Sequence, residues 1–328
     1  MTRYAMKAYA GSHEQMQDRI NKFKTLNLKP FMELHLISLD DMTKNRDVLI
    51  ANCAAFAPSD YQLHFPIQDS RNNYIFDPYR DETPWIEIAL DVCVDIGART
   101  MVTHRCCGFD QPLGRREAQE RFFQQVSEWD RLARERNVKI LIENYGFIWL
   151  PASFKKKFIA SALDHFFPWE IKDFLHMKSK CRWDHTEVLL DTAHATLSSN
   201  MFNMCRSVHE IRKDPRFKNI YQEDLDQTAW LEVKDFILKE INHFHISDAF
   251  VWSVEDSTTS VEKFLYEESL PLGEGTIPYH ELLSKFKDVK SIVMEINPKD
   301  GNHNDNQEQL QAIQYFMRLY DEGVELCV

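Results

Sequence analysis

Short apolar segments alternate with longer segments of helical periodicity from one end of the chain to the other. The short segments have the length and hydrophobicity of buried strands, and stretches such as 14–25 and 115–136 have the spacing of helices. Eight strands are predicted, near residues 3–10, 31–37, 60–65, 99–105, 138–144, 187–193, 241–247 and 289–297. Eight β–α units favour a (β/α)8 barrel over an open doubly wound sheet. We therefore predict a single α/β barrel domain over residues 1–328.

Two predicted connections are longer than a minimal β–α unit requires. They span 145–187 after the fifth strand and 196–240 after the sixth. Both leave the carboxyl ends of barrel strands, where binding sites form, so we expect these extended loops to overhang that end. The alternative is surface helices with no role in binding. Elsewhere, Thr83-Pro84 predicts a helix start, with Thr83 as N-cap and Pro84 as the first helical residue.

The composition argues against several classes of protein. The formal net charge is −12, from 39 Lys and Arg against 51 Asp and Glu, which argues against a nucleic-acid partner. The chain has only nine glycines, and it contains no dinucleotide fingerprint and no phosphate-binding loop. No apolar run is long enough to span a membrane, and the N-terminus lacks the apolar core of a signal peptide. We expect a cytoplasmic protein.

Cysteine usage agrees with that compartment. Seven cysteines, without a CxxC pair, predict reduced thiols rather than a disulfide framework. The adjacent Cys106 and Cys107 suggest either a redox pair or two buried, inert thiols, and we favour the second interpretation.

Four of the predicted strands end in side chains that bind metals. The strands concerned end in Glu143, Asp191, His245 and Glu295. Taken singly, such an acid is more often a helix cap or an ion-pair partner, and such a histidine is more often a core residue. Four of them at one end of a barrel predict a divalent-metal site, because unpaired carboxylates are costly to bury together. Three carboxylates and one imidazole suit Mn²⁺ or Mg²⁺, with Zn²⁺ or Co²⁺ as alternatives.

The order of these motifs resembles a known family. IENYG, LDTAHA, HFHISDA, PLGEGTIPYHELL and IVMEIN follow one another as in the xylose isomerase-like TIM barrels, over residues 30–297. That superfamily includes sugar isomerases, ketose 3-epimerases, inosose dehydratases and AP endonucleases. The resemblance implies that Glu143, Asp191, His245 and Glu295 are the metal ligands. It also implies that His194 contacts substrate or metal.

The resemblance assigns further positions to the substrate. His64 and His104 match histidines that face substrate in the sugar-active branches and hold further metals in the AP endonucleases. Arg105 follows His104 and suggests a partner for a phosphate or carboxylate, or else a surface ion pair. Trp149 and Trp252 follow ligand strands and suggest either stacking on a sugar or packing.

Other residues near these strand ends are predicted to orient the metal ligands or to shape the chain around them. Glu33 and His35 lie at the end of the second strand and suggest partners that orient a metal ligand. Gly273-Glu274-Gly275 has no phosphate-loop context, so we assign it a structural role in the turn that returns the chain over the barrel.

The sequence departs from two branches of the family. Ketose 3-epimerases carry a second Glu and an Arg where this chain has Trp149 and Val251, which puts a free ketose substrate in doubt. The AP endonucleases need an Asp-x-His motif before the Gly-x-Gly turn, and residues 267–273 contain no histidine. A three-metal phosphodiesterase site is therefore incomplete.

We predict a divalent-metal-dependent isomerase or epimerase of a sugar, sugar phosphate or polyol. Glu143 and Glu295 would transfer the proton through an enediolate, and His194 would bind the oxygen that develops charge. The alternatives are an inosose-type dehydratase, an AP endonuclease-like phosphodiesterase and a non-catalytic sugar-binding protein. Because relatives are often dimers or tetramers, the resemblance also implies a homo-oligomer.

Overall fold

Eight parallel strands close into a barrel in the order of the chain. The computed structural model describes residues 2–66, 81–104, 115–146, 167–213, 220–256 and 262–325. The strands are β1 (Arg3–Tyr9), β2 (Phe31–His35), β3 (Asp60–His64), β4 (Thr100–His104), β5 (Lys139–Glu143), β6 (Thr186–Asp191), β7 (His243–Ile246) and β8 (Ser291–Met294). β8 pairs with β1 and completes the barrel. The predicted (β/α)8 fold is confirmed.

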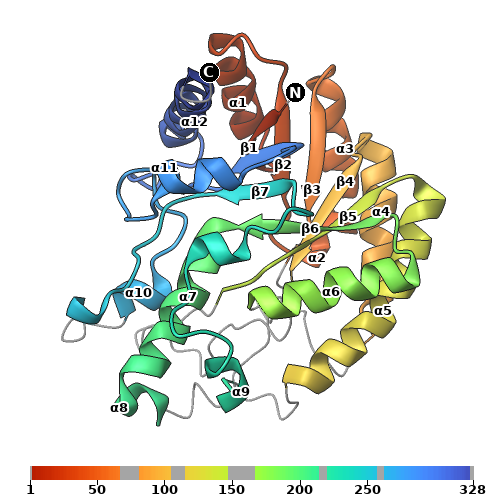
Figure 1. Ribbon diagram of the computed structural model, residues 1–328. Helices are drawn as coiled ribbons and strands as arrows, with labels where there is room; N and C mark the ends of the chain where they lie inside the picture. Colours follow the sequence, from red (N-terminus) through yellow and green to blue (C-terminus); the bar gives the residue numbers. More distant parts are fainter. Residues whose placement is uncertain are drawn as a thin grey trace.

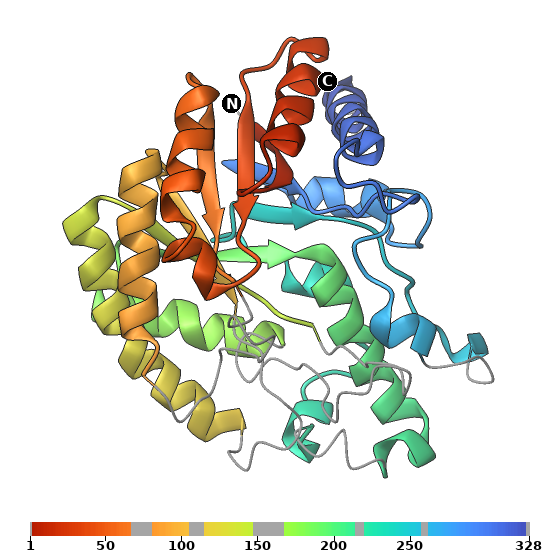
Figure 2. The same ribbon diagram turned by 180° about the vertical axis from the view of Figure 1, so that it is seen from behind.

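Helices surround this barrel (Figures 1 and 2). The α-helices are α1 (His13–Thr25), α2 (Leu39–Met42), α3 (Arg46–Ala55), α4 (Thr83–Ile96), α5 (Arg115–Arg136), α6 (Pro168–Cys181), α7 (Thr192–Ser207), α8 (His209–Arg212), α9 (Gln222–Leu225), α10 (Glu262–Tyr266), α11 (Tyr279–Leu282) and α12 (Gln307–Glu325). The 3-10 helices are η2 (Val233–Phe236), η3 (Val254–Asp256) and η4 (Leu283–Lys285). Among the helices that the structure describes, none is both long and apolar enough to cross a membrane.

Predicted element boundaries differ from the observed ones by up to three residues, and the end of β6 and the start of α4 are two examples. The strand predicted over 187–193 ends at Asp191, because the Asp191 carboxylate accepts a hydrogen bond from the backbone N–H of His194 (2.7 Å) and caps α7. Thr83 is the first residue of α4 rather than its cap, and Glu82 takes the N-cap position.

The segment predicted as an extension after the sixth strand begins as a buried helix. Residues 192–205 of α7 are all buried. Asn200 donates hydrogen bonds to the carbonyls of Phe250 (2.7 Å) and Phe264 (2.8 Å), so later segments pack over this helix. Of the extension after the fifth strand, residues 147–166 lie outside the described part, and α6 follows them.

Alternation along the strands divides their side chains between the barrel interior and the surrounding helices. Two small apolar clusters stand apart from the main core, one of Ala5, Phe31 and Val293 and one of Val102, Leu141 and Leu189. Every second position from these residues continues on the same side of its strand. That parity places Glu33, Glu143, Asp191 and Glu295 on one inner surface, toward the carboxyl ends of the strands. His245 joins them because it pairs in register with Asp191.

The same parity places Glu187 at the other end of the barrel, where β6 begins. Its carboxylate accepts hydrogen bonds from His243 Nε2 (3.1 Å), Lys290 Nζ (2.9 Å) and Lys139 Nζ. Burial alone would raise the pKa of Glu187, but these three partners hold it well below its usual range. This network stabilises the ionised carboxylate.

Glu187→Gln is therefore expected to lower the free energy of unfolding at pH 7 by roughly 2 kcal/mol. Because the pKa of Glu187 is lower in the folded protein than in the unfolded protein, its ionised carboxylate stabilises the fold above the unfolded pKa of about 4.3. This contribution declines as the pH falls from about 4.3 toward the folded pKa. Urea denaturation should show the full difference at pH 7 and a smaller one at pH 3. Glu240→Gln, at an exposed ion pair, serves as the control. Equal differences at both pH values would contradict this account.

Candidate metal centre

The structure brings together the four predicted metal ligands. Glu143 ends β5, Asp191 ends β6, His245 lies in β7 and Glu295 directly follows β8. One ligand atom from each of the four lies within 4.8 Å of the others. Three of the side chains are buried, and the side chain of Glu295 is 15% exposed. Three carboxylates and one imidazole thus share one enclosed space.

The donor atoms in this space have few hydrogen bonds of their own. Both Glu143 oxygens, His245 Nδ1 and Glu295 Oε2 are buried without a well-aligned hydrogen bond among the described residues. Yet His245 Nδ1 lies 2.7 Å from Glu295 Oε2 and 3.3 Å from Glu143 Oε1. Closely spaced donor atoms without aligned hydrogen bonds between them fit a bound cation, which would satisfy all of them.

Glu33 fixes the orientation of His245. His245 Nε2–H donates to Glu33 Oε2 (2.8 Å), so Nδ1 is the nitrogen that faces the other ligands. Gln62 donates to the same oxygen (2.7 Å), and Thr100 donates to Gln62 (2.9 Å). A carboxylate behind a histidine ligand is typical of metal sites. The arrangement supports the predicted supporting role of Glu33.

The electrostatics of the cluster also fit a cation. Burial, and then the nearby Glu143 and Glu295, raise the pKa of Asp191 to about 7. Burial alone would lower the pKa of His245, but Glu33, Glu143 and Glu295 raise it well above its usual value. Both shifts have the direction expected where negative charge is concentrated, and a bound cation would balance that charge.

His64 and His194, predicted to face the substrate, adjoin the same carboxylates. His64 Nε2 lies 3.4 Å from Glu143 Oε2, and His194 Nδ1 lies 3.2 Å from Glu143 Oε1. His194 Nδ1–H also donates to the carbonyl of Asn144 (2.9 Å). Both imidazoles therefore lie beside the ligand cluster.

Trp252, another predicted substrate residue, is not part of this cluster. Trp252 is only 2% exposed and its ring stacks on Trp230, with 5.9 Å between centroids. The indole therefore packs in the core and does not offer a face to a sugar, which corrects the stacking prediction. The remaining positions lie outside the described residues, namely the side chain of His104, Arg105, Trp149 and the pair Cys106 and Cys107.

Two charged residues at the site were not predicted. Lys7 Nζ lies 3.6 Å from Glu295 Oε1, and Glu268 Oε2 lies 3.2 Å from His194 Nε2. Alternation along β1 places the Lys7 side chain inside the barrel, so the sequence pattern could have predicted it. Glu268 depends on a contact between distant segments, the antiparallel bridge of Asp248 with Leu270.

The Gly273-Glu274-Gly275 turn is anchored by Asp248. The Asp248 carboxylate accepts hydrogen bonds from the backbone N–H groups of Gly273 (2.8 Å) and Ile277 (3.1 Å). A Cβ on Gly275 would lie 2.4 Å from both Ala249 O and Asp248 Oδ1, so only glycine fits there. These contacts support the structural role predicted for the turn.

Comparison with known proteins agrees with the barrel fold. The model of the xylose isomerase-like TIM barrel family matches residues 80–319. The chain belongs to this family. No curated protein matches the chain by sequence.

Three solved structures illustrate the likeness in fold. A D-tagatose 3-epimerase-like protein is 15% identical, with a TM-score of 0.59 over 99% of this chain and 100% of that chain. The IolI protein with a bound zinc atom is 14% identical, with a TM-score of 0.55 over 98% and 99%. The D-allulose 3-epimerase of Methylomonas sp., in complex with D-allulose, is 13% identical, with a TM-score of 0.54 over 97% of both chains.

Proposed function

We propose that this protein is a divalent-metal-dependent isomerase or epimerase of a sugar, sugar phosphate or related polyol. The observation that carries the proposal is the pair Glu143 and Glu295, two carboxylates at the ends of different strands that lie 3.3 Å and 2.7 Å from His245 Nδ1. Such a pair can remove a proton from carbon and return one. The names of two similar structures, D-tagatose 3-epimerase-like protein and D-allulose 3-epimerase, support a carbohydrate substrate.

Glu143, Asp191, His245 and Glu295 would hold the cation. Their hard, oxygen-rich donor set suits Mn²⁺ or Mg²⁺, and the zinc atom in the IolI protein makes Zn²⁺ an alternative. A bound cation supplies electrophilic stabilisation to a substrate oxygen that gains negative charge.

The side chains around the cation would perform the proton transfers. In this proposal Glu143 or Glu295 removes the proton next to the substrate carbonyl, and the other carboxylate returns a proton to the resulting enediolate. Burial alone would lower the pKa of His194, but Asp191, Glu268 and Glu143 raise it well above its usual value. A protonated His194 would donate a hydrogen bond to the developing oxyanion.

Solvent exchange tests the proposed reaction class. The metal-loaded protein is incubated in D₂O with a panel of ketoses, aldoses, their phosphates and inososes, and the products are followed by NMR and mass spectrometry. An isomerase or epimerase introduces deuterium at the carbon that loses its proton and otherwise conserves mass. Loss of water would indicate the dehydratase instead, and no turnover across the panel would contradict the proposal.

Glu268→Gln tests the proposed role of His194. The substitution removes a carboxylate that raises the pKa of His194, so the protonated form should be lost at lower pH. We expect the alkaline limb of the pH profile of kcat/KM to move to lower pH, with a roughly tenfold loss of activity at pH 8. Glu267→Gln, at the exposed neighbouring position, is the matched control. Identical pH profiles for both variants would refute the role given to Glu268.

A further inference from the structure

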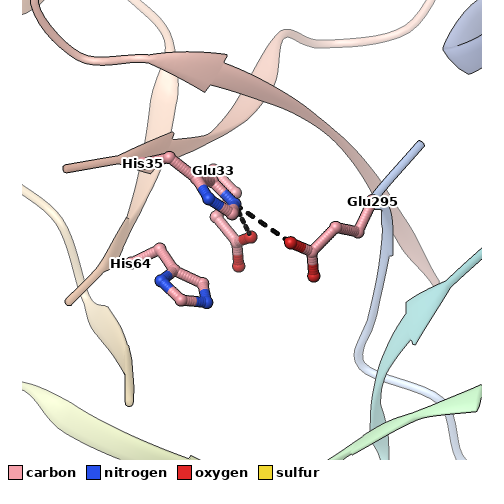
Figure 3. Close-up of side chains that lie close together, drawn as sticks. All are labelled: Glu33, His35, His64 and Glu295. Carbon is pink, nitrogen blue, oxygen red and sulfur yellow. Dashed lines mark hydrogen bonds and ion pairs between the residues drawn. The ribbon is translucent and has the colours of Figure 1, made fainter. Parts of the chain in front are cut away.

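A second group of ligand-type side chains lies beside the first centre. Glu33 and His35 from β2, His64 from β3, and Glu295 face one space (Figure 3). One ligand atom from each lies within 4.8 Å of the others. Only Glu295 belongs to both groups. Two imidazoles and two carboxylates form a donor set that suits Zn²⁺, Fe²⁺ or Mn²⁺.

We propose that Glu33, His35, His64 and Glu295 bind a second divalent cation next to the first, with Glu295 shared between the two ions. This inference goes beyond the proposed reaction, which needs only the first ion.

The two oxygens of Glu33 have separate partners. Oε2 accepts the hydrogen bonds from His245 and Gln62. Oε1 faces away from these donors, toward His35 Nε2 at 2.8 Å. Glu33 can therefore keep orienting His245 for the first ion while Oε1 binds the second.

The two histidines are held with suitable atoms toward the second site. His64 Nδ1–H donates to the carbonyl of Phe65 (3.0 Å), which leaves Nε2 for a ligand, and Nε2 lies 3.4 Å from Glu143 Oε2 at the border of the first centre. The rings of His35 and His64 stack with centroids 4.2 Å apart and planes at 18°.

Glu295 presents one oxygen to each group. Its Oε2 lies 2.7 Å from His245 Nδ1 in the first centre. Its Oε1 lies 3.9 Å from His35 Nε2 in the second. A carboxylate in this position can bridge two cations.

The ammonium group of Lys7 lies beside the second site. Lys7 Nζ lies 3.6 Å from Glu295 Oε1 and 3.3 Å from Asn297 Oδ1. Lys7 therefore competes with a second cation for Glu295, and we expect it to weaken that ion's binding.

Metal counting on the full-length chain tests the proposal. The metal-free protein is titrated with Mn²⁺ by calorimetry, and bound metal is measured after dialysis. We expect the wild type to bind two ions. His35→Gln should bind one ion, with nearly the wild-type affinity for the first ion. The control His209→Gln, at an exposed position, should bind two. Lys7→Met should bind the second ion about tenfold more tightly. The electron paramagnetic resonance spectrum of the doubly loaded protein should show coupled Mn²⁺ ions, and that of His35→Gln an isolated ion.

The outcomes separate this proposal from the proposed function. Saturation of the wild type at one ion would overturn the second site and leave the proposed reaction standing. Two ions retained by His35→Gln, with Lys7→Met unchanged, would also overturn it. A wild type that binds no divalent ion would refute both.

Discussion

Glu143→Gln and Glu295→Gln are each expected to reduce turnover by about 10³-fold or more, because each removes a carboxylate that we propose to transfer a proton at the reacting carbon. Glutamine keeps one ligand oxygen and nearly the same volume, so the fold should persist. The measurement is deuterium exchange into substrate, together with bound metal per chain. A variant that retains the first ion and loses exchange would separate proton transfer from metal binding.

The matched control for these variants is Glu187→Gln. It makes the same substitution inside the same barrel, at the other end of the strands. Its stability should fall, as derived above, while turnover in the folded protein stays near the wild-type value. Full activity in both Glu143→Gln and Glu295→Gln would contradict the roles given to these residues.

Asp191→Asn is expected to stabilise the metal-free protein while weakening metal binding. The pKa of Asp191 is raised to about 7 in the folded state, from an unfolded value near 3.9. Because the pKa of Asp191 is higher in the folded protein, ionisation of this carboxyl group does not affect the free energy of unfolding below about pH 4. It lowers that free energy as the pH rises from about 4 toward 7. Removal of the charge should therefore raise the free energy of unfolding at pH 8 by roughly 3 kcal/mol. Asparagine can still cap α7.

Denaturation with and without metal measures this effect. In EDTA, Asp191→Asn should be more stable than the wild type at pH 8 and nearly equal to it at pH 4. With Mn²⁺ at about 100 times its dissociation constant, the wild type should gain about 2.7 kcal/mol. Asp191→Asn should gain much less stability from the same concentration of Mn²⁺, because it binds the ion more weakly. If metal-free Asp191→Asn is no more stable than the wild type at pH 8, ionisation of Asp191 does not destabilise the fold.

Much of the architecture could be predicted from the sequence because the strands are short apolar runs with a constant period. The apolar run of β5 ends at the charged Glu143, and this change from apolar to charged residues predicted one ligand of the metal site. The strand period also placed Glu33 on the inner surface. The boundary after β6 was less predictable, since Asp191 both ends the strand and caps the helix that begins at Thr192.

The rest of the site depends on contacts between distant segments. Glu268 reaches His194 because the chain after β7 returns and pairs Leu270 with Asp248. No local pattern specifies that pairing. Trp252 shows the converse, because its position after a ligand strand suggested a substrate contact, whereas tertiary packing turns the ring onto Trp230.

The most direct test of the central claim is anomalous X-ray scattering from crystals soaked in Mn²⁺. We predict a strong peak with ligand bonds to Glu143, Asp191, His245 and Glu295 together. A Mn²⁺ peak held by any other set of residues, with none among these four at saturating metal, would contradict the proposed centre.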